Sequence, residues 1–219
     1  MPTVGIPLLF LFVVLSRVGV SKILDLADSA SSPRIPKFDL VVVPTFNTSR
    51  SETNITQVNS SDLPRIGYVV VTTDTWSVVV PHQVSSSRKS KLKPTSEQAK
   101  QHHCFLATNG GPYHEDGTCT GAVIVNGDTV IDRFDGVGFG ITRKPSKMWV
   151  IGSVASAEQA ATLGLQHYVT GFDWLVYSGK SVATERNNTT GASQAPRTAV
   201  GVDAVGRLML LVADGCQNW

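Results

Sequence analysis

Gly121-Ala122-Val123-Ile124-Val125-Asn126-Gly127-Asp128-Thr129-Val130-Ile131-Asp132 contains the clearest structural signal in the chain. Runs of mainly β-branched residues lie on both sides of Asn126-Gly127, and such runs favour strands. Asn-Gly suits a tight two-residue turn because both residues tolerate a positive φ angle. The segment therefore predicts a β-hairpin.

Short strands and turns recur outward from this hairpin. Strands are predicted over residues 68–73, 76–80, 105–108, 138–142, 149–151, 174–177, 181–183, 198–202 and 208–213, with a further edge strand over residues 40–43. Helices are expected only from Thr95 toward His103, with Thr95 and Gln98 as a capping box, and over residues 155–163. Strands outnumber helices, so the expected fold class is α+β with a predominantly antiparallel sheet.

The composition fits one soluble globular domain with a tail. The 219 residues are 42% hydrophobic, and 19 basic against 17 acidic residues leave a net charge of +2, so no nucleic-acid partner is expected. The basic run over residues 88–93 is more typical of a solvated loop than of a polyanion site. His102 and His103 are adjacent rather than spaced to converge on a metal, and we expect neither a metal nor a cofactor.

Residues 1–21 are interpreted as a secretory signal peptide. The apolar run over residues 6–15 is too short for a bilayer core, which needs about 20 residues, and small residues follow it. An uncleaved anchor is the alternative, and no transmembrane segment is expected once the signal is removed. The expected location is the secretory pathway, either secreted or lumenal.

Residues 22–62 are rich in Ser, Thr, Asn and Pro, and we interpret them as a flexible, glycosylated lead-in to a domain over residues 63–219. Glycosylation sequons begin at Asn47, Asn54, Asn59, Asn187 and Asn188.

The three cysteines, Cys104, Cys119 and Cys216, are an odd number for an exported chain. We expect a disulfide between Cys104 and Cys119, since closing a loop of about 15 residues would stabilise by roughly 3 kcal/mol. Cys216 is then left without a partner, and three buried thiols are the alternative.

Several motifs follow one another from Cys104 onward. Residues 104–111 end in Asn109-Gly110-Gly111, a turn expected to need positive φ, and the second cysteine follows within residues 117–121. The later motifs are residues 139–143, Gly171 with residues 174–176, residues 196–203 and residues 212–215. Their order and spacing resemble those of the phosphodiester glycosidase family.

The resemblance implies hydrolysis of a sugar-phosphate diester, which releases a sugar such as N-acetylglucosamine and leaves a phosphomonoester. Arg197 offers a bidentate donor for the phosphate, and the turn at Asn109, Gly110 and Gly111 offers backbone amides. Asp214 is the candidate catalytic carboxylate, acting as nucleophile or base. A surface ion pair for Arg197 and a turn-stabilising role for Asp214 are the alternatives.

Two departures from the family pattern affect this interpretation. Pro112-Tyr113-His114 stands where the family has paired aromatics, and Glu115 and Asp116 beyond it have no counterpart. The family continues past its Asp-Gly through a helix to Asn-Leu-Asp-Gly-Gly-Gly-Ser, whereas this chain ends at Trp219, so we expect a C-terminally incomplete domain. The alternative function is a non-catalytic secreted carbohydrate-binding glycoprotein that retains the scaffold.

Overall fold

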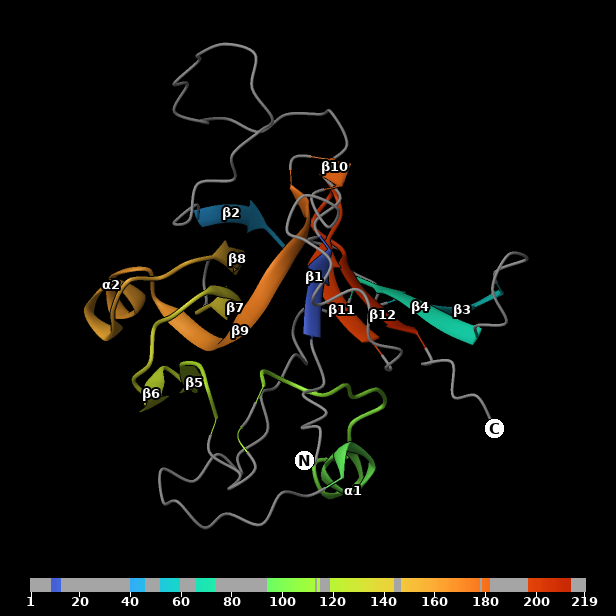
Figure 1. The fold of residues 1–219 in the computed structure, drawn as a ribbon, viewed down its shortest axis with the longest axis horizontal. Coiled ribbons are helices and arrows are strands. Elements are labelled where there is room, and N and C mark those ends of the chain that lie inside the picture. The colour runs from blue at the N-terminus through green and yellow to red at the C-terminus, as the bar shows by residue number, and fades with distance from the viewer. Residues whose placement is uncertain are drawn as a thin grey trace, which may run out of the picture.

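The computed structural model describes residues 9–12, 40–45, 52–59, 66–73, 94–112, 114, 119–143, 147–177, 179–181 and 197–213 (Figure 1). Its strands are β1 Leu9–Phe12, β2 Leu40–Pro44, β3 Thr53–Asn59, β4 Ile66–Thr72, β5 Val123–Val125, β6 Asp128–Ile131, β7 Val137–Thr142, β8 Met148–Gly152, β9 Leu165–Tyr177, β10 Lys180–Ser181, β11 Arg197–Val202 and β12 Leu208–Ala213. Its helices are α1 Thr95–Gln101 and α2 Ala157–Thr162.

The strands join in one hydrogen-bonded sheet with the order β2-β8-β7-β9-β1-β11-β12-β4-β3. Three short strands are attached beside this path: β10 pairs with β9, and β5 pairs with both β6 and β9. Within the described chain only β1 makes parallel pairs, with β9 and β11, and the other pairs are antiparallel. The predicted α+β class with a predominantly antiparallel sheet is confirmed.

The long strand β9 connects the two halves of this sheet (Figure 1). Its first part pairs with β7 and β5, and its last residues pair with β1 and β10. The buried residues along β9 are Leu165, His167, Tyr168, Thr170, Phe172 and Trp174. Backbone hydrogen bonds to these neighbouring strands hold β9 in place where the loops cross it.

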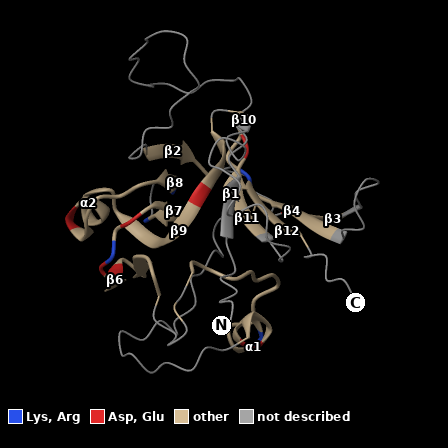
Figure 2. Ribbon diagram, viewed as in Figure 1, with Lys and Arg blue, Asp and Glu red and all other residues tan. Residues whose placement is uncertain are grey.

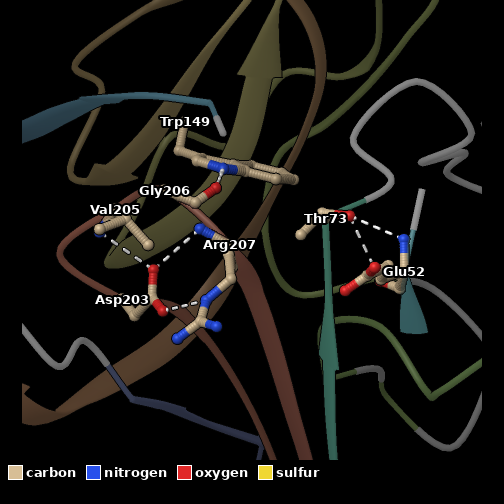
Figure 3. Close-up of polar contacts among 7 residues, drawn as sticks. All are labelled: Glu52, Thr73, Trp149, Asp203, Val205, Gly206 and Arg207. Carbon is tan, nitrogen blue, oxygen red and sulfur yellow. Dashed lines mark hydrogen bonds and ion pairs between the residues drawn. The ribbon is translucent and has the colours of Figure 1, made fainter. Parts of the chain in front are cut away.

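Apolar residues from both halves of the sheet form the main core. Trp149 on β8, Trp174 on β9 and Val202 on β11 belong to one buried cluster. Trp149 also donates a hydrogen bond of 2.8 Å from its indole Nε1 to the carbonyl oxygen of Gly206, in the turn between β11 and β12 (Figure 3). This buried bond ties the β8 side of the molecule to the β11–β12 hairpin.

Side-chain hydrogen bonds stabilise one end of each of two antiparallel strand pairs. Asp203 accepts hydrogen bonds from the backbone N–H groups of Val205 and Arg207 and pairs with the Arg207 guanidinium (Figure 3). At the end of the β3–β4 pair, Thr73 Oγ1 accepts a hydrogen bond of 2.8 Å from the backbone N–H of Glu52. Local polar contacts therefore hold the turn between β11 and β12 and the residues that directly flank the β3–β4 pair.

The predicted hairpin at Asn126-Gly127 is confirmed. Asn126 and Gly127 have φ angles of 53° and 89°, and Val125 pairs with Asp128 across the turn. Strands β4, β7, β8, β11 and β12, the hairpin between β9 and β10, and both helices also lie where the sequence predicted them.

Three predictions about local structure were wrong. Residues 105–108 form irregular backbone rather than a buried strand, and Phe105 is 81% exposed. Thr95 does not cap α1: Pro94 is the N-cap, without a side-chain hydrogen bond. Part of the presumed flexible lead-in is the regular strand β3, which pairs with β4 along its whole length.

The edge strand expected over residues 40–43 is present as β2, which pairs with β8. The strand predicted over residues 76–80 lies outside the described residues.

Candidate functional site

Two described parts of one loop, residues 108–112 and 119–122, lie against the middle of β9. A Cβ atom added at Gly111 would lie 2.5 Å from the carbonyl oxygen of Thr170, so only glycine fits there. A Cβ atom at Gly121 would meet the Thr170 hydroxyl even more closely. That hydroxyl accepts a hydrogen bond of 2.7 Å from the backbone N–H of Ala122. Thr170, which is only 1% exposed, therefore anchors both ends of the loop.

A further contact joins the two described parts of the same loop. Thr120 donates hydrogen bonds from its backbone N–H and its hydroxyl to the carbonyl oxygen of Pro112, each 3.0 Å long. The Pro112 ring lies where a Cβ of Gly171 would be, and Gly171 has a φ of +104°, so β9 needs glycine at this point. The loop and β9 thus approach each other closely at three glycines: Gly111, Gly121 and Gly171.

The Asn109-Gly110-Gly111 turn does not use the positive φ angles that the sequence predicted. Positive φ occurs at Gly171, Asn126 and other described residues, but not at these three. Gly111 is required by its approach to β9, whereas a Cβ added at Gly110 meets nothing within 4 Å. The turn therefore has one packed side, at Gly111, and one open side, at Gly110.

Asn109 links this loop to β11. Its Oδ1 atom accepts a hydrogen bond of 2.7 Å from the hydroxyl of Thr198, a residue 89 positions away, and one of 3.3 Å from the hydroxyl of Thr108. Thr198 is buried and directly follows Arg197. The Asn-Gly-Gly turn consequently lies at the beginning of β11.

The other two predicted site residues belong to the same end of the β11–β12 hairpin. Arg197 is the first residue of β11 and pairs through its backbone with Ala213, the last residue of β12. Asp214 is next in the chain and lies outside the described residues, as does the Arg197 side chain. The structure thus brings Asn109 to Thr198, and it pairs Arg197 with Ala213, the residue before Asp214.

The two described cysteines are free thiols, and the predicted disulfide remains a prediction. Cys104 is exposed and its Sγ lies 3.8 Å from the carbonyl oxygen of His102. Cys119 is half-buried, and this burial raises the pKa of its thiol above the usual value. Cys216 lies outside the described residues.

Asp173 is a carboxylate that the sequence analysis did not single out. It is half-buried on β9, three residues beyond Thr170, at the position that pairs with Phe10 of β1. Asp is uncommon in strands, so its presence in the run Gly171-Phe172-Asp173-Trp174 could have marked this residue as a functional candidate from the sequence alone. Elsewhere the charged residues of the described chain are scattered over separate elements, including β6 and α2 (Figure 2).

The described part of the chain contains no group of three or more His, Cys, Asp or Glu side chains that could hold a metal ion. Among the described residues there is also no helix with the length and apolar character needed to cross a bilayer.

Comparisons with known proteins agree with this arrangement of motifs. A sequence profile of the family described as phosphodiester glycosidase matches residues 102–218, which include the loop, β9 and the β11–β12 hairpin. This match covers more than half of the chain, and the protein belongs to the phosphodiester glycosidase family.

One solved structure with a similar fold is a zebrafish enzyme, described as the N-acetylglucosamine-1-phosphodiester alpha-N-acetylglucosaminidase catalytic domain, auto-inhibited by its pro-peptide. The TM-score is 0.62 at 22% sequence identity, and the alignment covers 82% of this chain and 66% of the zebrafish chain. The present chain therefore spans slightly less than two thirds of that relative. No curated protein sequence matches this chain.

Proposed function

We propose that this protein hydrolyses a sugar-phosphate diester, releasing a sugar such as N-acetylglucosamine and leaving a phosphomonoester. The observation that carries the proposal is the hydrogen bond between Thr198 and Asn109, because it brings the Asn-Gly-Gly turn to the residue beside Arg197. Both segments lie within the region that matches the phosphodiester glycosidase family.

The phosphate is held by Arg197 and the turn. A guanidinium presents a planar fork of N–H groups that matches two phosphate oxygens, and neighbouring backbone amides add weaker donors. The free space beside Gly110 supports this assignment, since a diester must approach the turn from an open side. Gly111 stays packed against β9 and holds the turn in place.

Bond cleavage is assigned to Asp214. Its carboxylate attacks the anomeric carbon or activates a water that does so, and the bond between that carbon and the phosphate oxygen breaks. The oxygen and the electron pair of this bond leave with the phosphate. When Asp214 is the nucleophile, water then hydrolyses the glycosyl ester and frees the sugar and the carboxylate; when Asp214 is the base, it takes the proton of the attacking water. Because a phosphomonoester is already a good leaving group, one carboxylate suffices and no separate general acid is required.

Substitutions in the β11–β12 hairpin test these roles. The assay measures release of N-acetylglucosamine from a diester that joins it through phosphate to mannose. Arg197→Ala and Asp214→Ala should each reduce kcat/KM by about a hundredfold or more, the usual cost of removing one group that stabilises the transition state. Arg197→Lys should recover only part of the loss, because lysine cannot bind the phosphate in a bidentate manner.

Arg207 provides the matched control, since it lies in the same hairpin at the opposite end and pairs with Asp203. Arg207→Ala should leave kcat/KM within about twofold. Wild-type turnover in both Arg197→Ala and Asp214→Ala would show that the assigned residues are wrong. Sugar binding without turnover in the wild type would instead favour a carbohydrate-binding glycoprotein.

We also propose that the protein enters the secretory pathway, where the sugar-phosphodiester partner would be part of a glycan. The predicted signal peptide and the sequons support this location. One of these sequons begins at Asn54, which is exposed on the edge strand β3 and so accessible to glycosylation.

A further inference from the structure

A row of side chains crosses the sheet beside the candidate site. Thr198 on β11 is opposite Val212 on β12, and Val212 is opposite Tyr68 on β4. Residues directly opposite each other in antiparallel strands point to the same face of the sheet. Tyr68 therefore shares a face with Thr198, whose hydroxyl holds Asn109. Because neighbouring strands lie about 4.8 Å apart, the backbone of Tyr68 is about 10 Å from that of Thr198.

This row is covered at one end and open at the other. Thr198 is buried, whereas Val212 is 40% exposed and Tyr68 is 47% exposed. The same face is closed again farther along β4 and β12, where Thr72 and Leu208 are opposite each other and buried. Tyr68 and Val212 therefore form an open floor beside the residue that holds the Asn-Gly-Gly turn.

Strand β3 extends this floor toward the edge of the sheet. Gln57 is opposite Tyr68, and Ile55, two residues earlier on β3, points to the same face. Both residues are exposed. Tyr68 thus has the aliphatic residues Val212 and Ile55 and the amide of Gln57 on its two neighbouring strands. We call these four residues the platform.

The composition of the platform suits a sugar ring. The faces of a pyranose present C–H groups, which stack on an aromatic ring, and its edge carries hydroxyl groups that need polar partners. The amide of Gln57 has groups that donate and groups that accept, so it matches a hydroxyl. Contiguous exposed apolar residues with polar neighbours mark binding surfaces, whereas single ones need no explanation.

We propose, building on the hydrolysis proposed above, that the platform binds the sugar that is released, while the phosphate lies at the Asn-Gly-Gly turn. The released sugar is favoured over the sugar that keeps the phosphate because Asp214, which is assigned to attack at the anomeric carbon, follows Val212 by two positions. Tyr68 and the two β3 residues precede residues 102–218, which match the family. A part of the chain outside that match therefore contributes to the choice of sugar.

The platform acts on binding rather than on bond cleavage. The sugar ring stacks on Tyr68 both before and during attack at the anomeric carbon, so the contact stabilises the bound substrate and the transition state alike. Loss of the aromatic ring should therefore raise KM and leave kcat within about twofold. A residue that acted only by positioning Asn109 would lower kcat instead.

Variants of Tyr68 in the full chain test this role. Tyr68→Thr removes the ring but keeps a residue that favours strands, and Tyr68→Phe keeps the ring. Hydrolysis is measured with two diesters of N-acetylglucosamine 1-phosphate, one carrying mannose on the phosphate and one carrying a methyl group. Tyr68→Thr should raise KM about fivefold or more for both diesters, and Tyr68→Phe should stay within about twofold of the wild type.

Val42→Ala is the matched control, since Val42 is also an exposed apolar strand residue but lies on β2, at the opposite edge of the sheet. It should leave KM and kcat unchanged. An increase in KM confined to the mannose diester would place the other sugar on the platform and overturn the assignment. A fall in kcat at unchanged KM in Tyr68→Thr would also overturn it, because it would give Tyr68 a purely structural role.

Direct binding separates this proposal from the proposed activity. Saturation-transfer NMR with N-acetylglucosamine 1-phosphate detects contact between the sugar protons and the protein without turnover. The wild type should saturate the ring protons of the sugar, and Tyr68→Thr should lose most of this signal. If this difference is seen but no diester is hydrolysed, the activity fails and the platform stands. No saturation by the wild type, or equal saturation by Tyr68→Thr, overturns the platform even if both diesters are hydrolysed.

Discussion

Replacing Gly111 with alanine should displace the Asn-Gly-Gly turn from β9, whereas the same change at Gly110 should not. The new Cβ would lie 2.5 Å from the carbonyl oxygen of Thr170 and 3.1 Å from Cγ1 of Val169. Ordinary contacts are about 3.5–4.0 Å long, so the loop must move by roughly 1 Å or leave its seat. At Gly110 nothing lies within 4 Å, and the change is accommodated.

The cost can be worked out from this geometry. Overpacking of this kind destabilises by about 1–3 kcal/mol, from which about 0.4–1 kcal/mol is offset because alanine restricts the unfolded chain. At about 2–4 °C per kcal/mol for a domain of this size, Gly111→Ala should lower Tm by up to about 10 °C. Gly110→Ala creates no close contact and only restricts the unfolded chain, so it should leave Tm unchanged or raise it by about 1–4 °C.

The assay combines thermal unfolding, followed by circular dichroism, with hydrolysis of the N-acetylglucosamine phosphodiester. Gly111→Ala should lower kcat/KM as well as Tm, because Asn109 moves with the turn and loses its bond to Thr198. Equal Tm values for the two variants would refute the packing of the loop on β9. A lowered Tm with unchanged kcat/KM would instead separate this loop from the catalytic site.

Three further predictions concern other parts of the molecule. At mildly alkaline pH, iodoacetamide should label exposed Cys104 well before Cys119, whose raised pKa keeps its thiol protonated to higher pH; protection of both cysteines until a reductant is added would instead demonstrate the disulfide. Trp149→Phe leaves the buried carbonyl of Gly206 without its donor, at a cost of about 1–3 kcal/mol, and should lower Tm by several degrees; an unchanged Tm would contradict this role. Asn54→Gln removes the predicted glycan from edge strand β3 and should increase self-association in analytical ultracentrifugation, and an identical sedimentation profile would count against a protective role.

Local sequence signals predicted the hairpins well, because their turns depend on a few residues. Asn126-Gly127 has the positive φ angles that the turn requires, and this turn pairs Val125 with Asp128. The strand β3 was missed because it is mainly polar and its residues 53–57 are exposed, so pairing with β4 rather than burial holds it in the sheet. Conversely, residues 105–108 look like a strand but are not paired, and Phe105 remains exposed.

The candidate site was predictable as a set of motifs but not as an arrangement. Gly111 was expected to adopt a positive φ, yet its actual constraint is the approach of Thr170, which lies in another strand and is invisible to local analysis. The bond between Asn109 and Thr198 likewise depends on the order of strands in the sheet. Chain topology, rather than the identity of any single residue, therefore brings the two motifs together.

The position of bond cleavage is the most direct test of the proposed activity. The diester is hydrolysed in water labelled with a heavy oxygen isotope, and the phosphomonoester product is analysed by mass spectrometry. Attack at the anomeric carbon leaves the original bridging oxygen on phosphorus. The wild type should therefore form a phosphomonoester without label, and Asp214→Ala should form little or none. Label in the phosphomonoester would place the attack at phosphorus and contradict a glycosidase mechanism.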